Sequence, residues 1–170
     1  GDNTIIGYDD SIVLPKESNR VTAEAEIAVV IGRACHSVSE EAAVGYIAGY
    51  CLVIDMTAED ILLRNPRFLT KSKNFDSFFS FGPELVTPDE ITDLMSLTVA
   101  TWKNGSLHRE NTVSNMAFNP FYLVSHFSHI STLYPGDVIS TGTPGATVIE
   151  SGDQVQCRVT GFRTLTNRAV

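Results

Sequence analysis

The stretch TAEAEIAVVI, residues 22–31, places two glutamates at the start of an apolar run. The apolar part is typical of a strand that is buried on both faces, and the weak alternation before it is typical of a strand with one polar face. We therefore expect a strand over residues 22–32. Because a buried strand rarely contains carboxylates, the positions of Glu24 and Glu26 need an explanation.

A second strand and two short helices are predicted downstream. Residues 46–55 are rich in Ile, Val, Leu and Tyr, and they predict a second buried strand that ends at Asp55. Between the two strands, a serine followed by two acids predicts a short helix over residues 40–46. Thr57 and Asp60 have the spacing of a capping box, so we expect Thr57 to begin another short helix and Asp60 to serve as a structural cap.

The composition favours one globular domain over residues 1–170. The chain is 43% hydrophobic, which is enough to form a core. Twenty acidic residues against twelve basic ones give a formal net charge of −8. That sign is wrong for binding nucleic acid phosphates or anionic lipid, so we expect a small-molecule partner, held with the help of a cation.

The cysteines and the N-terminus indicate the compartment. Three cysteines, far apart in the sequence, give neither a disulfide framework nor a zinc ligand pair, which favours a reducing environment. No apolar run approaches the roughly 18 residues of a membrane span, and the first residues lack the pattern of a signal peptide. We therefore expect a cytoplasmic protein without membrane contact. Nothing at the N-terminus resembles a natural start, so we expect upstream residues to be missing.

Three carboxylates can converge on one point. Glu24 and Glu26 are two residues apart in a predicted strand, so their side chains leave the same face. If the polar ends of the two strands meet, Asp55 joins them and forms the oxygen ligand set that Mg²⁺ or Mn²⁺ prefers. The alternative is that both glutamates lie on a solvated strand face and that Asp55 caps the following turn. The spacing alone leaves both interpretations open.

A set of motifs in fixed order resembles the catalytic domain of the fumarylacetoacetate hydrolase family, over nearly the whole chain. Each motif is weak by itself, but together they form a specific pattern. The motifs are Glu24-Ala-Glu26, Gly49-Tyr50, Asp55-Met-Thr-Ala58, Lys73-Asn-Phe-Asp76, Gly82-Pro83, Asn104-Gly105, Pro135-Gly-Asp137 and Thr141-Gly-Thr-Pro144.

This resemblance implies an α+β, β-rich fold in which mixed β-sheets roll around the active site, with a few short helices, and it implies a homodimer. It also implies a divalent cation, Mg²⁺ or Mn²⁺ with Ca²⁺ as an alternative, bound by Glu24, Glu26 and Asp55. A cation at this point would offset the repulsion between the acids and so explain their position.

The resemblance further implies substrates that are 2-oxo or β-diketo acids. Lys73 matches an active-site lysine, which holds the substrate carboxylate or the enolate oxygen, and Thr143 matches a threonine that binds the substrate carboxylate, presented by a turn at Gly142. The expected activity is hydrolysis of a carbon-carbon bond in an acylpyruvate-like compound through a metal-stabilised enolate, in catabolism. The alternatives are a decarboxylase, a dehydratase or an isomerase or tautomerase acting on related acids, and a metal-binding domain that has lost catalysis.

The chain departs from the family pattern in two ways. Glu59 and Leu62 stand where the family usually has an arginine and a polar residue, which should change the substrate tail that is tolerated; Arg64 is a candidate replacement for the arginine. The second departure concerns a mobile lid with a His-x-x-Glu pair that activates water in many members. We expect it to belong to the missing upstream part; the alternatives are that this member uses another base or that it does not hydrolyse, so the sequence leaves the general base open.

Overall fold

The two longest strands form the centre of one sheet. In the computed structural model, which describes residues 1–170, β3 (Val21–Ile31) pairs antiparallel with β4 (Ile47–Ala58) along its whole length. The strand predicted over residues 22–32 is confirmed to within one residue at each end. The second strand continues past its predicted end at Asp55 as far as Ala58.

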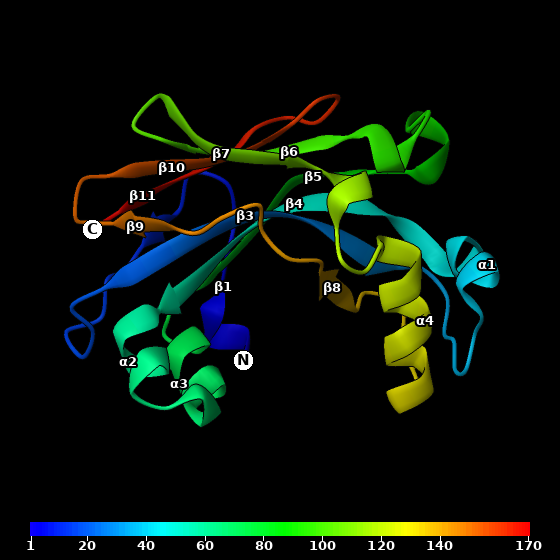
Figure 1. Ribbon diagram of the computed structural model, residues 1–170, viewed down its shortest axis with the longest axis horizontal. Coiled ribbons are helices and arrows are strands. Elements are labelled where there is room, and N and C mark those ends of the chain that lie inside the picture. Colours follow the sequence, from blue (N-terminus) through cyan, green and yellow to red (C-terminus); the bar gives the residue numbers. More distant parts are fainter.

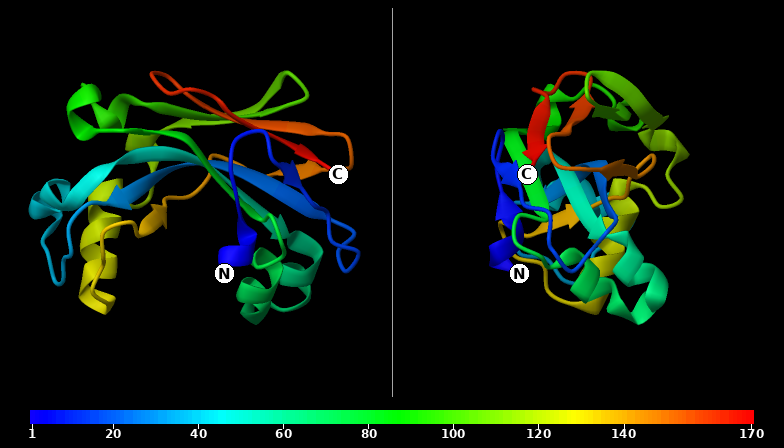
Figure 2. Two further views of the ribbon diagram at one scale, coloured as in Figure 1. Left: turned by 180° about the vertical axis from the view of Figure 1, so that it is seen from behind. Right: turned by 90° about the vertical axis from the view of Figure 1, so that its left-hand side faces the viewer.

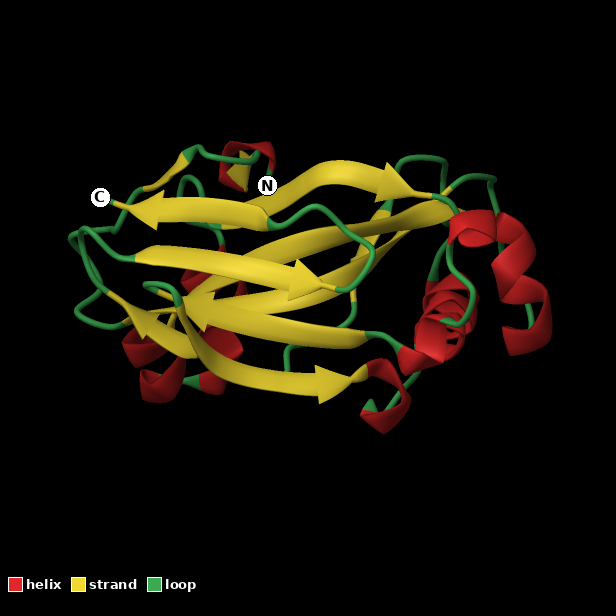
Figure 3. Cartoon of the chain, turned by 90° about the horizontal axis from the view of Figure 1, so that it is seen from above, coloured by secondary structure: helices red, strands yellow, loops and turns green.

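The chain forms two sheets that lie one above the other (Figure 1). Each sheet contains one parallel pair, β1 with β5 and β2 with β11, among antiparallel neighbours, so the predicted mixed sheets are confirmed. Figure 3 shows the long strands from above. The first sheet has the order β1 (Ile5–Ile6), β5 (Phe79–Val86), β4, β3, β8 (Val138–Ser140), with β9 (Thr147–Ile149) also on β3; the second has the order β2 (Ser11–Ile12), β11 (Leu165–Ala169), β10 (Gln154–Val159), β6 (Thr98–Lys103), β7 (Ser106–Thr112).

The helices are few and short, as predicted. They are α1 (Glu40–Ala43), α2 (Glu59–Arg64), α3 (Leu69–Lys73) and α4 (Pro120–Ile130), with six 3-10 turns at Asp2–Thr4, Val44–Tyr46, Pro66–Phe68, Pro88–Glu90, Leu94–Ser96 and Val113–Asn115. Helices α2 and α3 lie near one end of the first sheet and α4 near the other, on the side away from the second sheet (Figures 1 and 2). None of the helices combines the length and apolarity that crossing a membrane requires.

Alternation along β3 divides its side chains between two environments. Ala23, Ala25 and Ile27 belong to the large core cluster that also contains residues of the second sheet. Ala28 belongs to a small separate cluster with Val53. Since successive side chains of a strand point to opposite faces, the two glutamates of β3 share the face of the small cluster. This face is turned away from the second sheet.

Candidate active site

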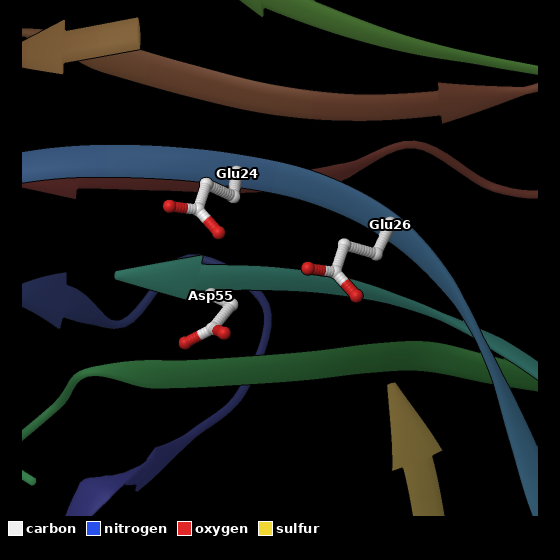
Figure 4. Close-up of side chains that lie close together, drawn as sticks. All are labelled: Glu24, Glu26 and Asp55. Atoms are coloured by element: carbon white, nitrogen blue, oxygen red, sulfur yellow. The ribbon is translucent and has the colours of Figure 1, made fainter. Parts of the chain in front are cut away.

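Three carboxylates meet on this outer face of the first sheet. Glu24 and Glu26 come from β3 and Asp55 comes from β4, where the register sets it directly opposite Glu24. One carboxylate oxygen from each residue lies within 4.8 Å of the others, and Figure 4 shows the three side chains turned toward one another. Of the two interpretations that the spacing left open, the structure therefore shows the one in which the three carboxylates converge. The metal-ligand role of these residues remains a prediction.

Glu26 is the most deeply buried of the three, with 4% of its surface exposed. It accepts hydrogen bonds from the hydroxyl of Ser140 and from the backbone N–H of Gly142, the latter at 2.7 Å. Burial raises the pKa of Glu26 from 4.5 to about 7, and the charges of Asp55 and Glu24 add to the increase, while the two hydrogen bonds oppose it. A bound cation would therefore relieve a strong electrostatic conflict.

Lys73 is the cation next to this group. From the end of α3, its Nζ lies 2.5 Å from Oδ2 of Asp55 and 3.4 Å from Oε2 of Glu24. Burial alone would lower the pKa of Lys73, but the neighbouring carboxylates outweigh it and raise the pKa. Burial raises the pKa of Asp55, against the opposing effect of Lys73. One ammonium among three carboxylates leaves two negative charges uncompensated when all are ionised, which suits a divalent cation.

Thr57 also belongs to this group, and the capping-box prediction for it was wrong. Thr57 lies inside β4, 3% exposed, and the residue that precedes α2 is Ala58, which gives no side-chain cap. The Thr57 hydroxyl donates to Oε1 of Glu24 at 3.1 Å and accepts from Lys73 at 2.8 Å. Its position two residues after Asp55 places it on the same strand face, and that spacing was the signal available in the sequence.

The loop from Thr141 to Pro144 borders the carboxylates on the side of Glu26. Gly142 has a positive φ of 101°, which favours glycine, and its N–H reaches Glu26. Thr143 is partly buried, and its hydroxyl accepts from the N–H of Gly145 at 3.2 Å. The structure thus brings Gly142 to the carboxylates, and the substrate-binding role of Thr143, the next residue in the chain, remains a prediction.

The same loop also lines a cavity of about 300 Å³. Its walls include Ile27, Val99 and Leu123 but none of the three carboxylates. Ile27 points into the core, away from the face of Glu26, so the cavity lies on the other side of the loop. The candidate site is therefore the carboxylate face and not this half-open cavity.

The charged residues of α2 have other partners than expected. Arg64 forms an ion pair with Asp60 at 3.3 Å, and its side chain is 64% exposed. Asp60 accepts a hydrogen bond from Ser18 at 2.6 Å, so it holds the chain that enters β3. Glu59 forms an ion pair with Arg20. Arg64 is therefore engaged at Asp60, and the cation beside Glu59 is Arg20.

The thiols have the environment of core residues. All three cysteines are buried, and burial raises the pKa of Cys51 and of Cys157 to about 12. A thiol with so high a pKa is not a nucleophile at neutral pH.

Comparison with known proteins agrees with the motifs. The sequence model described as Fumarylacetoacetate (FAA) hydrolase C-terminal matches residues 1–170. The chain belongs to the fumarylacetoacetate hydrolase family. The resemblance drawn from the motifs is confirmed.

Relatives within the fumarylacetoacetate hydrolase family have several activities. The mitochondrial oxaloacetate tautomerase Fahd2a of Rattus norvegicus is 35% identical over 176 residues, which cover 99% of this chain and 56% of that protein. The crystal structure of a 5-carboxymethyl-2-hydroxymuconate delta-isomerase from Mycobacterium smegmatis superposes with a TM-score of 0.94 at 36% identity, covering 99% of this chain and 66% of that one. This chain therefore spans between about half and two thirds of these two proteins.

A third relative supports the fold. The fumarylpyruvate hydrolase of Pseudomonas aeruginosa, solved in complex with Mn²⁺ and pyruvate, has a TM-score of 0.92 at 22% identity, over 99% of this chain and 75% of that one. The predicted fumarylacetoacetate hydrolase type of β-rich fold is confirmed by these structures.

Proposed function

We propose that this chain carries the active site of a divalent-metal-dependent enzyme that acts on a 2-oxo or β-diketo acid through its enolate. The observation that carries the proposal is the meeting of Glu24, Glu26 and Asp55 within 4.8 Å, with only Lys73 to balance their charge. These three carboxylates would hold Mg²⁺ or Mn²⁺ by hard oxygen ligands, with Ca²⁺ as the alternative. A cation held there supplies a Lewis acid that stabilises negative charge on a substrate oxygen.

The residues around the carboxylates have separate roles in this proposal. Lys73, whose raised pKa keeps it an ammonium at neutral pH, donates hydrogen bonds to the enolate oxygen or substrate carboxylate and does not remove a proton. Thr143 binds the substrate carboxylate by its hydroxyl and N–H. Gly142 shapes the turn that presents Thr143, and its own N–H fixes Glu26.

The reaction that follows enolate formation has two candidates. Hydrolysis of a carbon-carbon bond in an acylpyruvate is the reaction predicted from the motifs. Keto–enol tautomerisation is the second candidate, because relatives at 35% and 36% identity are named as a tautomerase and an isomerase. Decarboxylation and dehydration use the same enolate, and a domain that binds metal without turnover remains the non-catalytic alternative. The homodimer and the cytoplasmic location stay predictions.

The test of this site begins with binding. Protein stripped of metal is titrated with Mg²⁺ and Mn²⁺, with and without oxalate as a stable enolate mimic, by calorimetry and thermal melting. Wild type should bind oxalate only when metal is present, and so should the control Glu110→Gln, which changes an exposed residue away from the carboxylates. Asp55→Asn should bind neither the metal nor oxalate. If Asp55→Asn binds metal and oxalate as wild type does, the three carboxylates are not the site.

The same preparation then separates the reactions. Cleavage of acetylpyruvate and tautomerisation of oxaloacetate are each followed by ultraviolet absorbance. Turnover of acetylpyruvate alone would assign the chain to carbon-carbon bond hydrolysis, and turnover of oxaloacetate alone would assign it to tautomerisation. Metal-dependent oxalate binding with no turnover of any tested oxo acid, in the full-length protein as well as in this chain, would favour the non-catalytic alternative.

A further inference from the structure

The polar face of the first sheet continues beyond the carboxylates. The pairing register of β3 with β4, which sets Glu24 opposite Asp55, extends one pair past the strand ends and sets Arg20 opposite Glu59. The N–H of Glu59 donates to the carbonyl of Arg20 at 2.9 Å, which confirms this extension. The two side chains form an ion pair, with 51% of Arg20 and 31% of Glu59 exposed. We call these two residues the terminal pair.

The terminal pair lies in line with the candidate site. Arg20 directly precedes β3 and is four residues before Glu24, so continued alternation places it on the same face, about 13 Å along the strand direction. Between them lies Thr57, with its bond to Lys73. Gly142 borders the opposite end, where its N–H donates to Glu26. A substrate whose reacting oxygen lies at Lys73 and whose extended tail spans on the order of 10 Å would therefore bring its far end to the terminal pair.

The terminal pair offers both hydrogen-bonding senses without net charge. Arg20 donates its Nε–H to Oε2 of Glu59, which leaves the Nη donors of the guanidinium and Oε1 of Glu59 for a ligand. A second carboxylate on the substrate would gain from Arg20 but would be repelled by Glu59. A hydroxyl can donate to Glu59 and accept from Arg20, and a carbonyl can accept from Arg20. Arg64, at the far end of α2 from Glu59, forms its ion pair with Asp60 and so does not take part in the terminal pair.

We infer that Arg20 and Glu59 form the distal end of the substrate site and select 2-oxo acids with an uncharged polar far end over 2-oxo dicarboxylates. This inference rests on the proposed function, because it assigns the tail specificity of the same site. Glu59 supplies the selection against a second negative charge, and Arg20 holds Glu59 in position. Both residues determine specificity and take no part in the chemical step.

The test uses ligands of equal chain length. Binding of 2-oxodecanedioate, 2-oxodecanoate and 10-hydroxy-2-oxodecanoate, whose chains are long enough to reach Arg20 and Glu59, is measured with Mg²⁺ present, and oxalate, which has no tail, serves as the reference. Wild type should bind the hydroxyl-tailed acid about tenfold more tightly than 2-oxodecanedioate. Glu59→Gln frees the charge of Arg20 and should shift this ratio about tenfold toward 2-oxodecanedioate. Arg20→Gln should shift it in the other direction.

Two controls keep the outcomes separate. Arg64→Gln removes the neighbouring exposed cation and should leave the ratio unchanged. Oxalate affinity should be equal in all four proteins, which also shows that each variant is folded. If wild type binds no oxalate with metal, the proposed function fails. If oxalate binds equally but Glu59→Gln leaves the tail ratio unchanged, the proposed function stands and the assignment of the terminal pair is overturned.

Discussion

Replacing Glu26 by glutamine should stabilise the protein when metal is removed. The side chain is 4% exposed, and its pKa is raised from 4.5 to about 7. Each factor of ten in the ionisation constant is worth about 1.4 kcal/mol, so this rise in the pKa of Glu26 means that the ionised carboxylate destabilises the native protein by roughly 3 kcal/mol. Glutamine has the same shape, and its carbonyl oxygen can still accept from Ser140 and Gly142. Glu26→Gln should therefore raise the free energy of unfolding by up to about 3 kcal/mol at pH 8.

The pH dependence distinguishes this cause from better packing. Native Glu26 keeps its proton up to about pH 7, whereas the unfolded chain loses it near pH 4.5. The native state therefore binds more protons in this window, and the stability of wild type falls as pH rises through it. The advantage of Glu26→Gln should be nearly absent at pH 4.5 and complete above pH 7.

Urea unfolding in the presence of EDTA measures the free energy of unfolding of wild type and of Glu26→Gln at pH 5 and at pH 8. The control is Glu110→Gln at an exposed position of β7, which should change stability little at either pH. A gain of equal size at both pH values, or a loss at pH 8, would refute the electrostatic reasoning. With Mn²⁺ added at pH 8, wild type should become more stable than Glu26→Gln, because wild type gains metal-binding energy that the variant largely loses.

Three further results are expected. Thr57→Val should reduce metal-dependent oxalate affinity about tenfold, with Thr57→Ser restoring most of it, because the hydroxyl bridges Glu24 and Lys73; equal affinity in all three proteins would show that the bridge is dispensable. The native thiols should resist iodoacetamide at pH 8 and react after unfolding in urea, as their raised pKa values require; rapid labelling of the native protein would contradict the burial. Gly49→Ala should cost about 1 to 3 kcal/mol in urea unfolding, because the new Cβ would lie 2.5 Å from the carbonyl oxygen of Val86; unchanged stability would mean that the neighbouring strand moves aside.

Local sequence patterns were sufficient for the central strands, and they made the meeting of the acids one of two open interpretations. Alternation places Glu24 and Glu26 on one face, and the polar end of the next strand supplies Asp55. Both inferences use only neighbours in the chain and one antiparallel pairing. The order of strands within the two sheets was not predictable in this way, because it depends on contacts between distant segments.

The interpretation of Thr57 shows where local patterns fail. Its spacing to Asp60 matches a capping box, but β4 keeps pairing with β3 as far as Ala58, and this ladder determines the backbone at Thr57. The partners of Glu26 present a different limit. Ser140 and Gly142 lie 114 and 116 residues away in the sequence, so only the completed sheet brings them to the carboxylate.

Each carboxylate of the candidate site is supported by a different part of the fold. Glu26 is held by the segment after β8, Asp55 by Lys73 from α3, and Glu24 by Thr57 from β4. Pairing of β8 with β3 and packing of α3 on β4 therefore orient the acids before any ligand arrives. The repulsion between the acids lowers the free energy of unfolding of the metal-free protein. A cation would then meet an arranged set of oxygens, so its binding energy would not be spent on ordering side chains. This arrangement explains why the same residue, Glu26, is expected to weaken the metal-free protein and to strengthen the metal-bound one.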